Sequence, residues 1–203
     1  MDEIPLFRRG DGRWGTRNHV LVMPLVAAAS GVARAIAYGT GATWVEHDYE
    51  PEPDDLAQNV ARVSRTFVGF ATNPNVAAVL LVADIARHAS ALDAVRSEGQ
   101  RADLVVVAES GGVRDAIASG RARLAPLLAQ AAAAMRDRAP ASALMLGTEC
   151  GGSDALSGIT ANPALGEASD LLVDAGGTVI LAETTELIGA SRCSLGACCE
   201  QPA

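Results

Sequence analysis

The sequence contains no lysine, because all 16 of its basic residues are arginine. Within these 203 residues, this absence excludes Schiff-base chemistry and a lysine acting as general base. A genome-wide preference for arginine and alanine is a sufficient cause. The absence of lysine therefore excludes reactions that need a lysine but does not indicate a function.

Aromatic residues make up only 3% of the sequence, so the core must be built from alanine, valine, leucine and isoleucine. The net charge is −8 with scattered arginines, which excludes the basic footprint of a nucleic-acid-binding protein. Acidic residues follow Met1 at once and no apolar run could span a membrane, so we expect neither a signal peptide nor a membrane partner. We therefore expect a cytoplasmic protein with reduced cysteines.

Short apolar runs alternate with helix-like segments along the chain. The expected strands cover residues 20–26, 43–46, 76–82, 104–107, 143–147 and 178–182, and the expected helices cover residues 30–38, 56–71, 85–98, 113–138 and 164–175, the fourth being interrupted near Gly120. This rhythm predicts an α/β fold: a mostly parallel sheet with helices on both faces, in Rossmann-like three-layer units. We expect one domain over residues 1–190.

Residues 191–203 hold three of the four cysteines, Cys193, Cys198 and Cys199. They do not show the paired Cys-x-x-Cys spacing of a zinc site. We expect a divergent, disordered tail here, and metal binding by these thiols is the alternative.

The stretch richest in chemical groups follows the expected strand 143–147. Residues 148–154 read Thr-Glu-Cys-Gly-Gly-Ser-Asp, and residues 157–166 read Ser-Gly-Ile-Thr-Ala-Asn-Pro-Ala-Leu-Gly. Strand, polar loop and helix is the layout in which an α/β protein presents a site at the carboxyl end of its sheet. Glycines let the backbone approach a ligand, and Asn162-Pro163 favours a helix start. The same residue types also build ordinary tight turns, which is the alternative.

This stretch resembles the altronate and galactarate dehydratases, a family of sugar-acid hydro-lyases that includes the sulfolactate sulfo-lyase large subunit. Those proteins carry Lys-Cys-Gly-Gly-Ser-Asp followed by Ser-Gly-Ile-Thr-Ala-Asn-Pro-Ala-Leu-Gly. Glu149 stands where the family has lysine. The similarity continues through residues 168–173, 176–181 and 186–189, so the chain resembles a short and divergent member of this family.

The N-terminal segment carries a second part of the resemblance. Residues 7–19 match the family's Arg-x-Asp-Gly-Arg-x-Gly-x-Arg-Asn pattern before the first strand. An arginine can bind both oxygens of a carboxylate, so Arg13 and Arg17 are candidate ligands for a substrate carboxylate. A surface loop held together by arginine hydrogen bonds is the alternative.

The resemblance implies a metal-dependent dehydration of a small carboxylate substrate. Such a reaction removes a proton next to a carboxylate and expels the neighbouring hydroxyl, with a metal stabilising the developing charge. The resemblance implies iron(II) or manganese, held by cysteine, histidine and carboxylate groups. Magnesium is the alternative, because an oxygen-rich ligand set favours harder ions.

The chain departs from the family at three strand ends that should converge on one site. The family has cysteines there, whereas this chain has Ala27-Ala28-Ala29, His47-Asp48-Tyr49-Glu50 and Ala83-Asp84-Ile85-Ala86. The family's site is therefore either abandoned or rebuilt with oxygen ligands. The groups left for a rebuilt site are His47, Asp48, Asp84, Glu109, Glu149, Cys150 and Asp154.

We expect the following roles. The catalytic candidates are His47, Glu149 and Asp154; the metal ligands are Cys150, His47 and Asp84; and the substrate-binding candidates are Arg13, Arg17, Asn18, Gly151, Gly152, Ser153, Ser157, Thr160 and Asn162. Each has a structural alternative, such as a helix cap at Asp84 or a buried thiol at Cys150. We expect His19 and His88 to be structural or exposed.

Two functions from different classes fit these features. The first is a lyase of the dehydratase type. The second is a non-catalytic homologue that acts as a binding, regulatory or partner subunit after losing the cysteine loops. The partners expected are a small carboxylate substrate and either a second copy of the chain or a second subunit that supplies missing domains.

Overall fold

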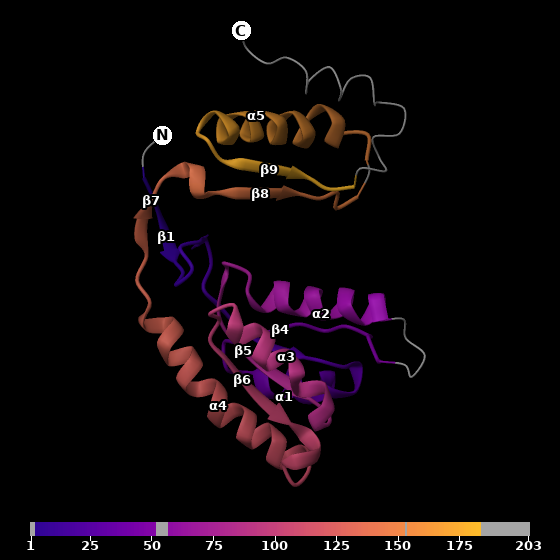
Figure 1. Ribbon diagram of the computed structural model, residues 1–203. Helices are drawn as coiled ribbons and strands as arrows, with labels where there is room; N and C mark the ends of the chain where they lie inside the picture. The colour runs from indigo at the N-terminus through magenta and orange to yellow at the C-terminus, as the bar shows by residue number, and fades with distance from the viewer. Residues whose placement is uncertain (1–2, 52–56, 153, 184–203) are drawn as a thin grey trace. The chain divides into compact units, whose positions relative to one another are not determined.

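The computed structural model describes residues 3–51, 57–152 and 154–183 (Figure 1). The chain divides into two compact units rather than the one domain expected over residues 1–190. The N-terminal unit is Pro5–Arg138, and the described part of the C-terminal unit comprises residues 139–152 and 154–183 together with residues 3–4. The tail from residue 191 lies outside the described residues.

A four-stranded parallel sheet forms the centre of the N-terminal unit. Its strand order is β4-β3-β5-β6, and its strands are β4 (Thr43–Trp44), β3 (His19–Pro24), β5 (Val76–Ala83) and β6 (Ala102–Val106). The two central strands are almost wholly apolar and buried on both faces. Continuous apolar runs of this kind are typical of parallel strands covered on both sides.

Helices cover both faces of this sheet. One face packs against α1 (Ser30–Ala37) and α4 (Val113–Ala133), around Val22, Leu80 and Val82. The other face packs against α2 (Ala57–Ala71) and α3 (Ala91–Ser97), around Met23, Val79 and Leu81. The predicted α/β class, with helices on both faces of a parallel sheet, is confirmed.

The strand order places a switch point between β3 and β5. The connection after β3 leads through α1 to β4 on one side, whereas the connection after β5 leads through α3 to β6 on the other. In doubly wound sheets, ligands bind where such loops diverge at the carboxyl ends of the strands.

Helix α4 runs without the interruption that was expected near Gly120. A Cβ atom at Gly120 would collide with the Ile36 side chain of α1. The glycine is therefore explained by close packing of two helices and does not break the helix. The expected helix to residue 138 ends at Ala133, and a short strand, β7 (Asp137–Ala139), follows.

A small third sheet was not predicted. Its order is β2-β1-β7, with β1 (Ile4–Arg8) antiparallel to β2 (Trp14–Gly15). The predicted polar segment over residues 7–19 thus contains a hairpin. Its strands, of five and two residues, are too short to show period-2 patterning.

The C-terminal unit is a two-stranded parallel sheet with one helix. Strand β8 (Met145–Thr148) pairs with β9 (Thr178–Leu181), and α5 (Ala161–Asp174) connects the loop after β8 to β9 (Figure 1). Several apolar side chains of this unit are exposed, including Met145, Leu171 and Ile180. No helix among the described residues is long and apolar enough to cross a membrane.

Candidate functional site

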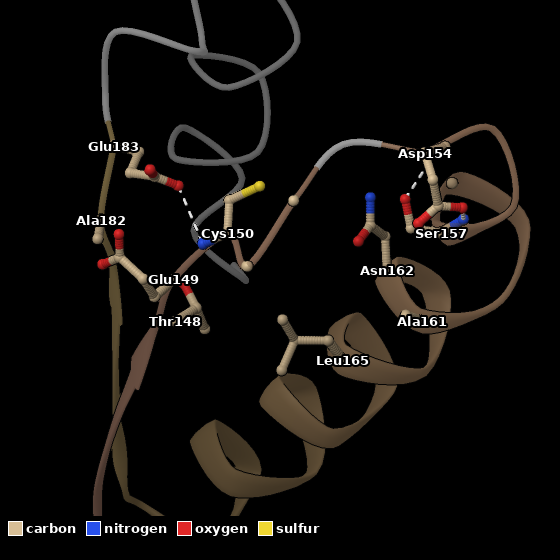
Figure 2. A pocket seen from close by; sticks show the side chains of 13 residues that line it. Thr148, Glu149, Cys150, Asp154, Ser157, Ala161, Asn162, Leu165, Ala182 and Glu183 are labelled. Atoms are coloured by element: carbon tan, nitrogen blue, oxygen red, sulfur yellow. Dashed lines mark hydrogen bonds between the residues drawn. The ribbon is translucent and has the colours of Figure 1, made fainter.

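The glycine-rich loop begins at the carboxyl end of β8 and leads to α5, as the strand–loop–helix pattern predicted. Beside it lies an open cavity of about 880 Å³. Figure 2 shows Glu149, Cys150 and Glu183 on the side of the strand ends, with Asp154, Ser157 and Asn162 on the side of α5. The described lining residues are Thr148, Glu149, Cys150, Gly151, Gly152, Asp154, Ser157, Gly158, Ala161, Asn162, Leu165, Ala182 and Glu183.

Glu183 is a site residue that the sequence analysis missed. Its Oε2 atom accepts a hydrogen bond of 3.0 Å from the backbone nitrogen of Cys150. Its backbone φ of 60° lies in the left-handed region, which residues other than glycine rarely adopt. The signal in the sequence was its position directly after the expected strand 178–182, and the structure shows that this strand pairs with β8.

Asp154 builds the turn that leads to α5. Its Oδ1 atom accepts hydrogen bonds from the backbone nitrogens of Leu156 (2.7 Å) and Ser157 (2.9 Å). These two bonds lower the pKa of the Asp154 carboxyl below its usual value. Asp154 is therefore ionised at neutral pH and unsuited to donating a proton.

The substrate-binding candidates on this loop fall into three groups. Gly151, Gly152, Ser157 and Asn162 line the cavity. Thr160 is outside the lining, and its hydroxyl donates to the Leu156 carbonyl at 2.8 Å. Ser153 lies outside the described residues.

Every charged side chain in the described lining is a carboxylate: Glu149, Asp154 and Glu183. The Cys150 thiol is exposed, which differs from the buried alternative considered for it. Among the described residues, no three histidine, cysteine, aspartate or glutamate side chains lie close enough together to hold a metal ion. The described groups therefore do not form a metal centre by themselves.

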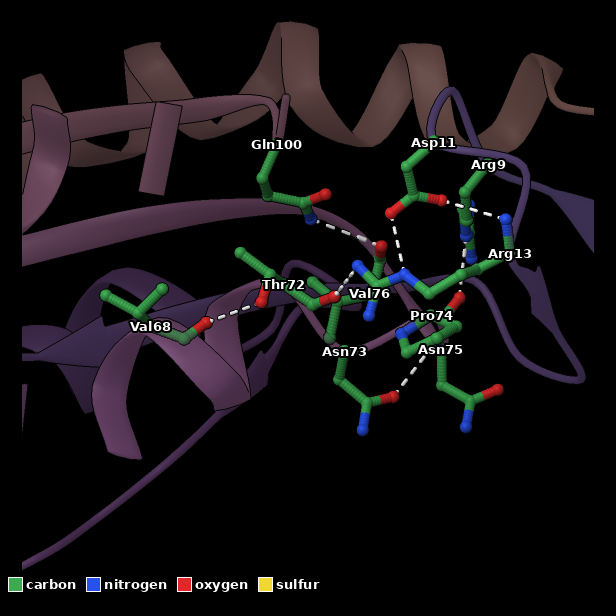
Figure 3. A network of polar contacts seen from close by, with 10 residues as sticks. All are labelled: Arg9, Asp11, Arg13, Val68, Thr72, Asn73, Pro74, Asn75, Val76 and Gln100. Carbon is green, nitrogen blue, oxygen red and sulfur yellow. Dashed lines mark hydrogen bonds and ion pairs between the residues drawn. The ribbon is translucent and has the colours of Figure 1, made fainter. Parts of the chain in front are cut away.

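The N-terminal arginine motif lies against the turn between α2 and β5 (Figure 3). The Arg9 guanidinium donates to Pro74 O (2.6 Å), Asn18 Oδ1 (2.7 Å) and Arg17 O (2.8 Å). Burial lowers the pKa of Arg9, and nearby Asp11 opposes this effect. Gly15 belongs to the same arrangement, because a Cβ there would collide with Pro74 O.

Two of the predicted substrate-binding residues in this motif, Arg13 and Asn18, have protein partners. Arg13 donates to Asp11 Oδ2 (2.7 Å) and to Thr72 O (2.8 Å), and the Asn18 amide donates to Ala131 O (2.7 Å). For Arg17, only backbone atoms take part in the hydrogen bonds found in the described part of the chain. Arg17 is thus the member of this group whose guanidinium is available for a ligand.

The segments that follow β3, β4 and β5 all lie at the carboxyl edge of the sheet, because the three strands are parallel, and hydrogen bonds join the first two segments. His47 Nε2 donates to Pro24 O (2.9 Å), and Ala27 N donates to Tyr49 O (2.7 Å). The Glu50 carboxylate accepts from Ala28 N at 3.1 Å. The segment after β4 thus crosses directly over the end of β3.

Both ring nitrogens of His47 are engaged. Nδ1 accepts from Tyr49 N at 3.2 Å, whereas Nε2 faces the Pro24 carbonyl, which can only accept. This pairing assigns the tautomer with hydrogen on Nε2. His47 can act as a base or metal ligand only if one of these hydrogen bonds breaks.

Asp84 is paired with His88, which was expected to be structural or exposed. Asp84 Oδ1 lies 2.5 Å from His88 Nδ1 and also accepts from Ile85 N at 2.7 Å. Burial raises the pKa of Asp84, but the hydrogen bonds from His88 and Ile85 outweigh it, so the pKa is lowered overall. The sequence offered a signal for this pair, because Asp84 and His88 are four residues apart directly after an expected strand.

The predicted site residues thus occupy three places. Glu149, Cys150 and Asp154 lie in the C-terminal unit. In the N-terminal unit, His47 and Asp84 lie at the carboxyl ends of the strands, whereas Arg13 and Asn18 lie at the amino ends. Of the other candidates, Asp48 follows β4, and Glu109 closes a 3-10 turn after β6.

Comparison with known families matches both units. Residues 6–132 match the family described as D-galactarate dehydratase/altronate hydrolase, second domain, and residues 141–202 match D-galactarate/altronate dehydratase, C-terminal. The division at residues 138–139 falls between the two matches. The second match includes residues 191–202, which were expected to diverge.

Individual relatives agree. The chain is 33% identical over 197 residues to (2R)-sulfolactate sulfo-lyase subunit beta of Chromohalobacter salexigens, covering 93% of this chain and 49% of that protein. It is 30% identical over 213 residues to altronate dehydratase of Escherichia coli, covering 97% of this chain and 42% of that protein. A 52-residue segment, 26% of the chain, is 62% identical to part of the galactarate dehydratase (L-threo-forming) of E. coli, covering 10% of that protein. The chain spans less than half the length of each relative.

Proposed function

The chain belongs to the D-galactarate/altronate dehydratase family, and from this premise we propose that it takes part in a lyase reaction on a small hydroxy or sugar acid. The reaction would be loss of water: a proton leaves the carbon next to the carboxylate, and the neighbouring hydroxyl departs. Altronate and galactarate are the first acids to test, because relatives are named as dehydratases of these compounds. Those relatives are much longer than this chain, so the acid that this chain acts on is itself a proposal.

The observation that supports this proposal is the glycine-rich loop beside the cavity at the ends of β8 and β9. There, Glu149 is our candidate for the base that takes the proton, because its carboxylate lines the cavity. Glu183 holds the backbone of Cys150 through the 3.0 Å hydrogen bond and so fixes the start of the loop. Asp154 shapes the turn and stays ionised.

Binding of an acid in this cavity requires a positive charge. The described lining offers three carboxylates and no basic side chain, so a substrate carboxylate would be repelled. We propose that the compensating charge comes from outside the described lining, from a bound cation or from a second subunit.

A divalent metal, iron(II) or manganese with magnesium as alternative, stays a proposal. The described residues do not fit such an ion by themselves, because no group of three ligating side chains is formed. No step of the reaction is therefore assigned to a metal.

A second candidate function, that of a non-catalytic partner subunit, is favoured by the hydrogen bonds of His47 and Asp84. The N-terminal unit carries a bonded His47 and a paired Asp84 where the family has cysteines. A non-catalytic homologue, acting as a partner for another subunit, would have this structure. A relative named as subunit beta makes a partner chain a reasonable target for a search.

The deciding experiment is a lyase assay on anaerobically purified protein, with and without added iron(II) or manganese, against a panel of hydroxy acids that includes altronate and galactarate. We expect loss of water from one member and a large drop in rate for Glu149→Gln. Glu167→Gln is the matched control, since Glu167 lies on α5 and is outside the cavity lining. If wild type turns over no acid with either ion, the lyase proposal fails and the partner-subunit proposal gains support.

A further inference from the structure

The loops at the switch point of the N-terminal unit line a shallow, open pocket whose lining is mostly apolar. Its volume is about 180 Å³, which is room for about six water molecules. The walls come from the end of β3, the segment after β4, α2 and the start of α3, with Leu25, Val63 and Phe67 among the apolar side chains. This is the place where doubly wound sheets bind ligands, but its surface is unlike that of a sugar-acid site.

Phe67 gives the pocket a fixed aromatic wall. Its ring centroid lies 4.9 Å from that of His47 and 6.1 Å from that of Tyr49, so the ring packs against both. His47 in turn is fixed by the hydrogen bonds to Pro24 and Tyr49. The wall therefore needs little reorganisation to accept a ligand.

Among the described residues that line the pocket, Arg87 is the one arginine, and a chain of hydrogen bonds orients its guanidinium. Asp84 holds His88 at 2.5 Å, and His88 Nε2 accepts from Arg87 Nε at 3.2 Å. Across the part of the chain that the structure describes, the two terminal nitrogens of Arg87 have no hydrogen-bond partner. The Asp84 carboxylate already accepts a hydrogen bond from His88, and Glu50, which is not among the described lining residues, accepts one from Ala28 N.

We propose that this pocket binds a small carboxylic acid with an apolar body, such as a short branched-chain acid. The Arg87 fork binds the carboxylate, and Phe67 and Val63 contact the hydrocarbon part. A carboxylate can only accept hydrogen bonds, and His88 has no free donor for it, because Nδ1 is bonded to Asp84 and Nε2 accepts from Arg87. His88 is therefore a positioning residue that holds Arg87.

A polyhydroxylated acid does not suit this pocket. Its hydroxyl groups would lose water against apolar walls without gaining partners, and that loss is unfavourable. The site is therefore distinct from the cavity beside Cys150. It also stands independently of the lyase proposal, since it lies within the other unit and uses none of the same residues.

The test is a titration of the full chain with isovalerate, followed by calorimetry or by NMR shifts. Isovaleramide has the same hydrocarbon part without the charge, so it tests the role of the carboxylate. Gluconate is a polyhydroxylated acid, so it tests the preference for an apolar body. We expect wild type to bind isovalerate at least about tenfold more tightly than either comparison compound, the size of one charge-assisted contact.

Three variants locate the site. Arg87→Gln should weaken isovalerate about tenfold and remove the preference over the amide. Arg65→Gln, an exposed arginine on α2 outside the pocket lining, should behave as wild type. Ala91→Leu should fill the pocket and abolish binding of both compounds.

Several results would overturn the proposal. These are no binding of isovalerate by folded wild type at millimolar concentration, equal binding of acid and amide, tighter binding of gluconate, or equal losses in Arg87→Gln and Arg65→Gln. Should Ala91→Leu fail to fold by circular dichroism, the two arginine variants still decide, because both side chains are exposed.

Discussion

Oδ1 of Asp84 lies 2.5 Å from Nδ1 of His88, and this carboxylate, which the sequence suggested as a metal ligand, is therefore already paired with a histidine. The pair stands at the end of β5, next to the switch point. A metal at Asp84 would have to compete with His88 and with the backbone nitrogen of Ile85. The local structure therefore does not favour a metal ion held by Asp84.

The first prediction concerns the pH dependence of stability. Although burial raises it, the hydrogen bonds from His88 and Ile85 hold the pKa of Asp84 below its usual value in the folded protein, so folding favours the ionised form. The contribution of Asp84 is present above about pH 4 and is lost as the pH falls through the lowered pKa. We expect Asp84→Asn to lower the free energy of unfolding by about 1 kcal/mol at pH 6, and by less at pH 3.

Urea unfolding at both pH values checks this. Asp93→Asn is the control, because Asp93 is exposed on α3 and forms none of the hydrogen bonds described above. A loss for Asp84→Asn that is as large at pH 3 as at pH 6 would contradict the role of the ionised Asp84 carboxylate.

The layers of the N-terminal unit could be predicted because their signals are local. Buried parallel strands such as β3 and β5 are short, continuous apolar runs, and these runs need no knowledge of the rest of the chain. The hairpin of β1 and β2 could not be predicted, since its two strands have no alternation of apolar and polar residues. Gly120 was misread for a related reason: its significance depends on Ile36, 84 positions away in the sequence.

The second prediction tests the packing at Gly120. We expect Gly120→Ala to destabilise the protein by about 1–3 kcal/mol, because the new methyl group overlaps the Ile36 side chain. Gly31→Ala is the matched control, since that helical glycine faces open space and alanine should stabilise it by about 0.5–1 kcal/mol. Thermal unfolding measures both.

The double variant Gly120→Ala with Ile36→Val separates collision from other causes. Removing one methyl group from Ile36 should recover part of the loss caused by Gly120→Ala, giving a favourable coupling energy. Strict additivity of the two changes would show that the collision is not the cause.

The third prediction separates structure from substrate binding in the N-terminal motif. Arg9→Met removes three hydrogen bonds to Pro74, Asn18 and Arg17, so we expect a loss of about 2–3 kcal/mol in the free energy of unfolding. Arg17→Met should leave stability within about 0.5 kcal/mol of wild type, because its guanidinium has no such bonds in the described structure.

The Arg17 variant also tests the carboxylate-binding role that the sequence suggested. If a substrate is found, Arg17→Met should raise KM with little change in stability. A stability loss equal to that of Arg9→Met would instead place Arg17 in the same structural arrangement.

The candidate site could be predicted in position but not in detail. The glycine-rich loop showed itself by composition and by its place after a strand. Glu183 was missed because its proximity to Cys150 arises from pairing of β8 with β9, which are far apart in the sequence. Asp154 was assigned a catalytic role because the sequence does not distinguish a carboxylate that binds substrate from one that accepts hydrogen bonds from backbone nitrogens.

The last prediction distinguishes these two roles of Asp154. Asn at this position keeps an oxygen that can accept from Leu156 and Ser157, whereas alanine does not. We therefore expect amide hydrogen exchange at residues 156 and 157 to be near wild type in Asp154→Asn and about tenfold faster in Asp154→Ala. If Asp154 only builds the turn, any lyase activity should be near wild type in Asp154→Asn and lower in Asp154→Ala. Activity lost equally in both variants, with exchange unchanged in Asp154→Asn, would show that the negative charge itself is needed, because the turn would be intact while the charge is gone.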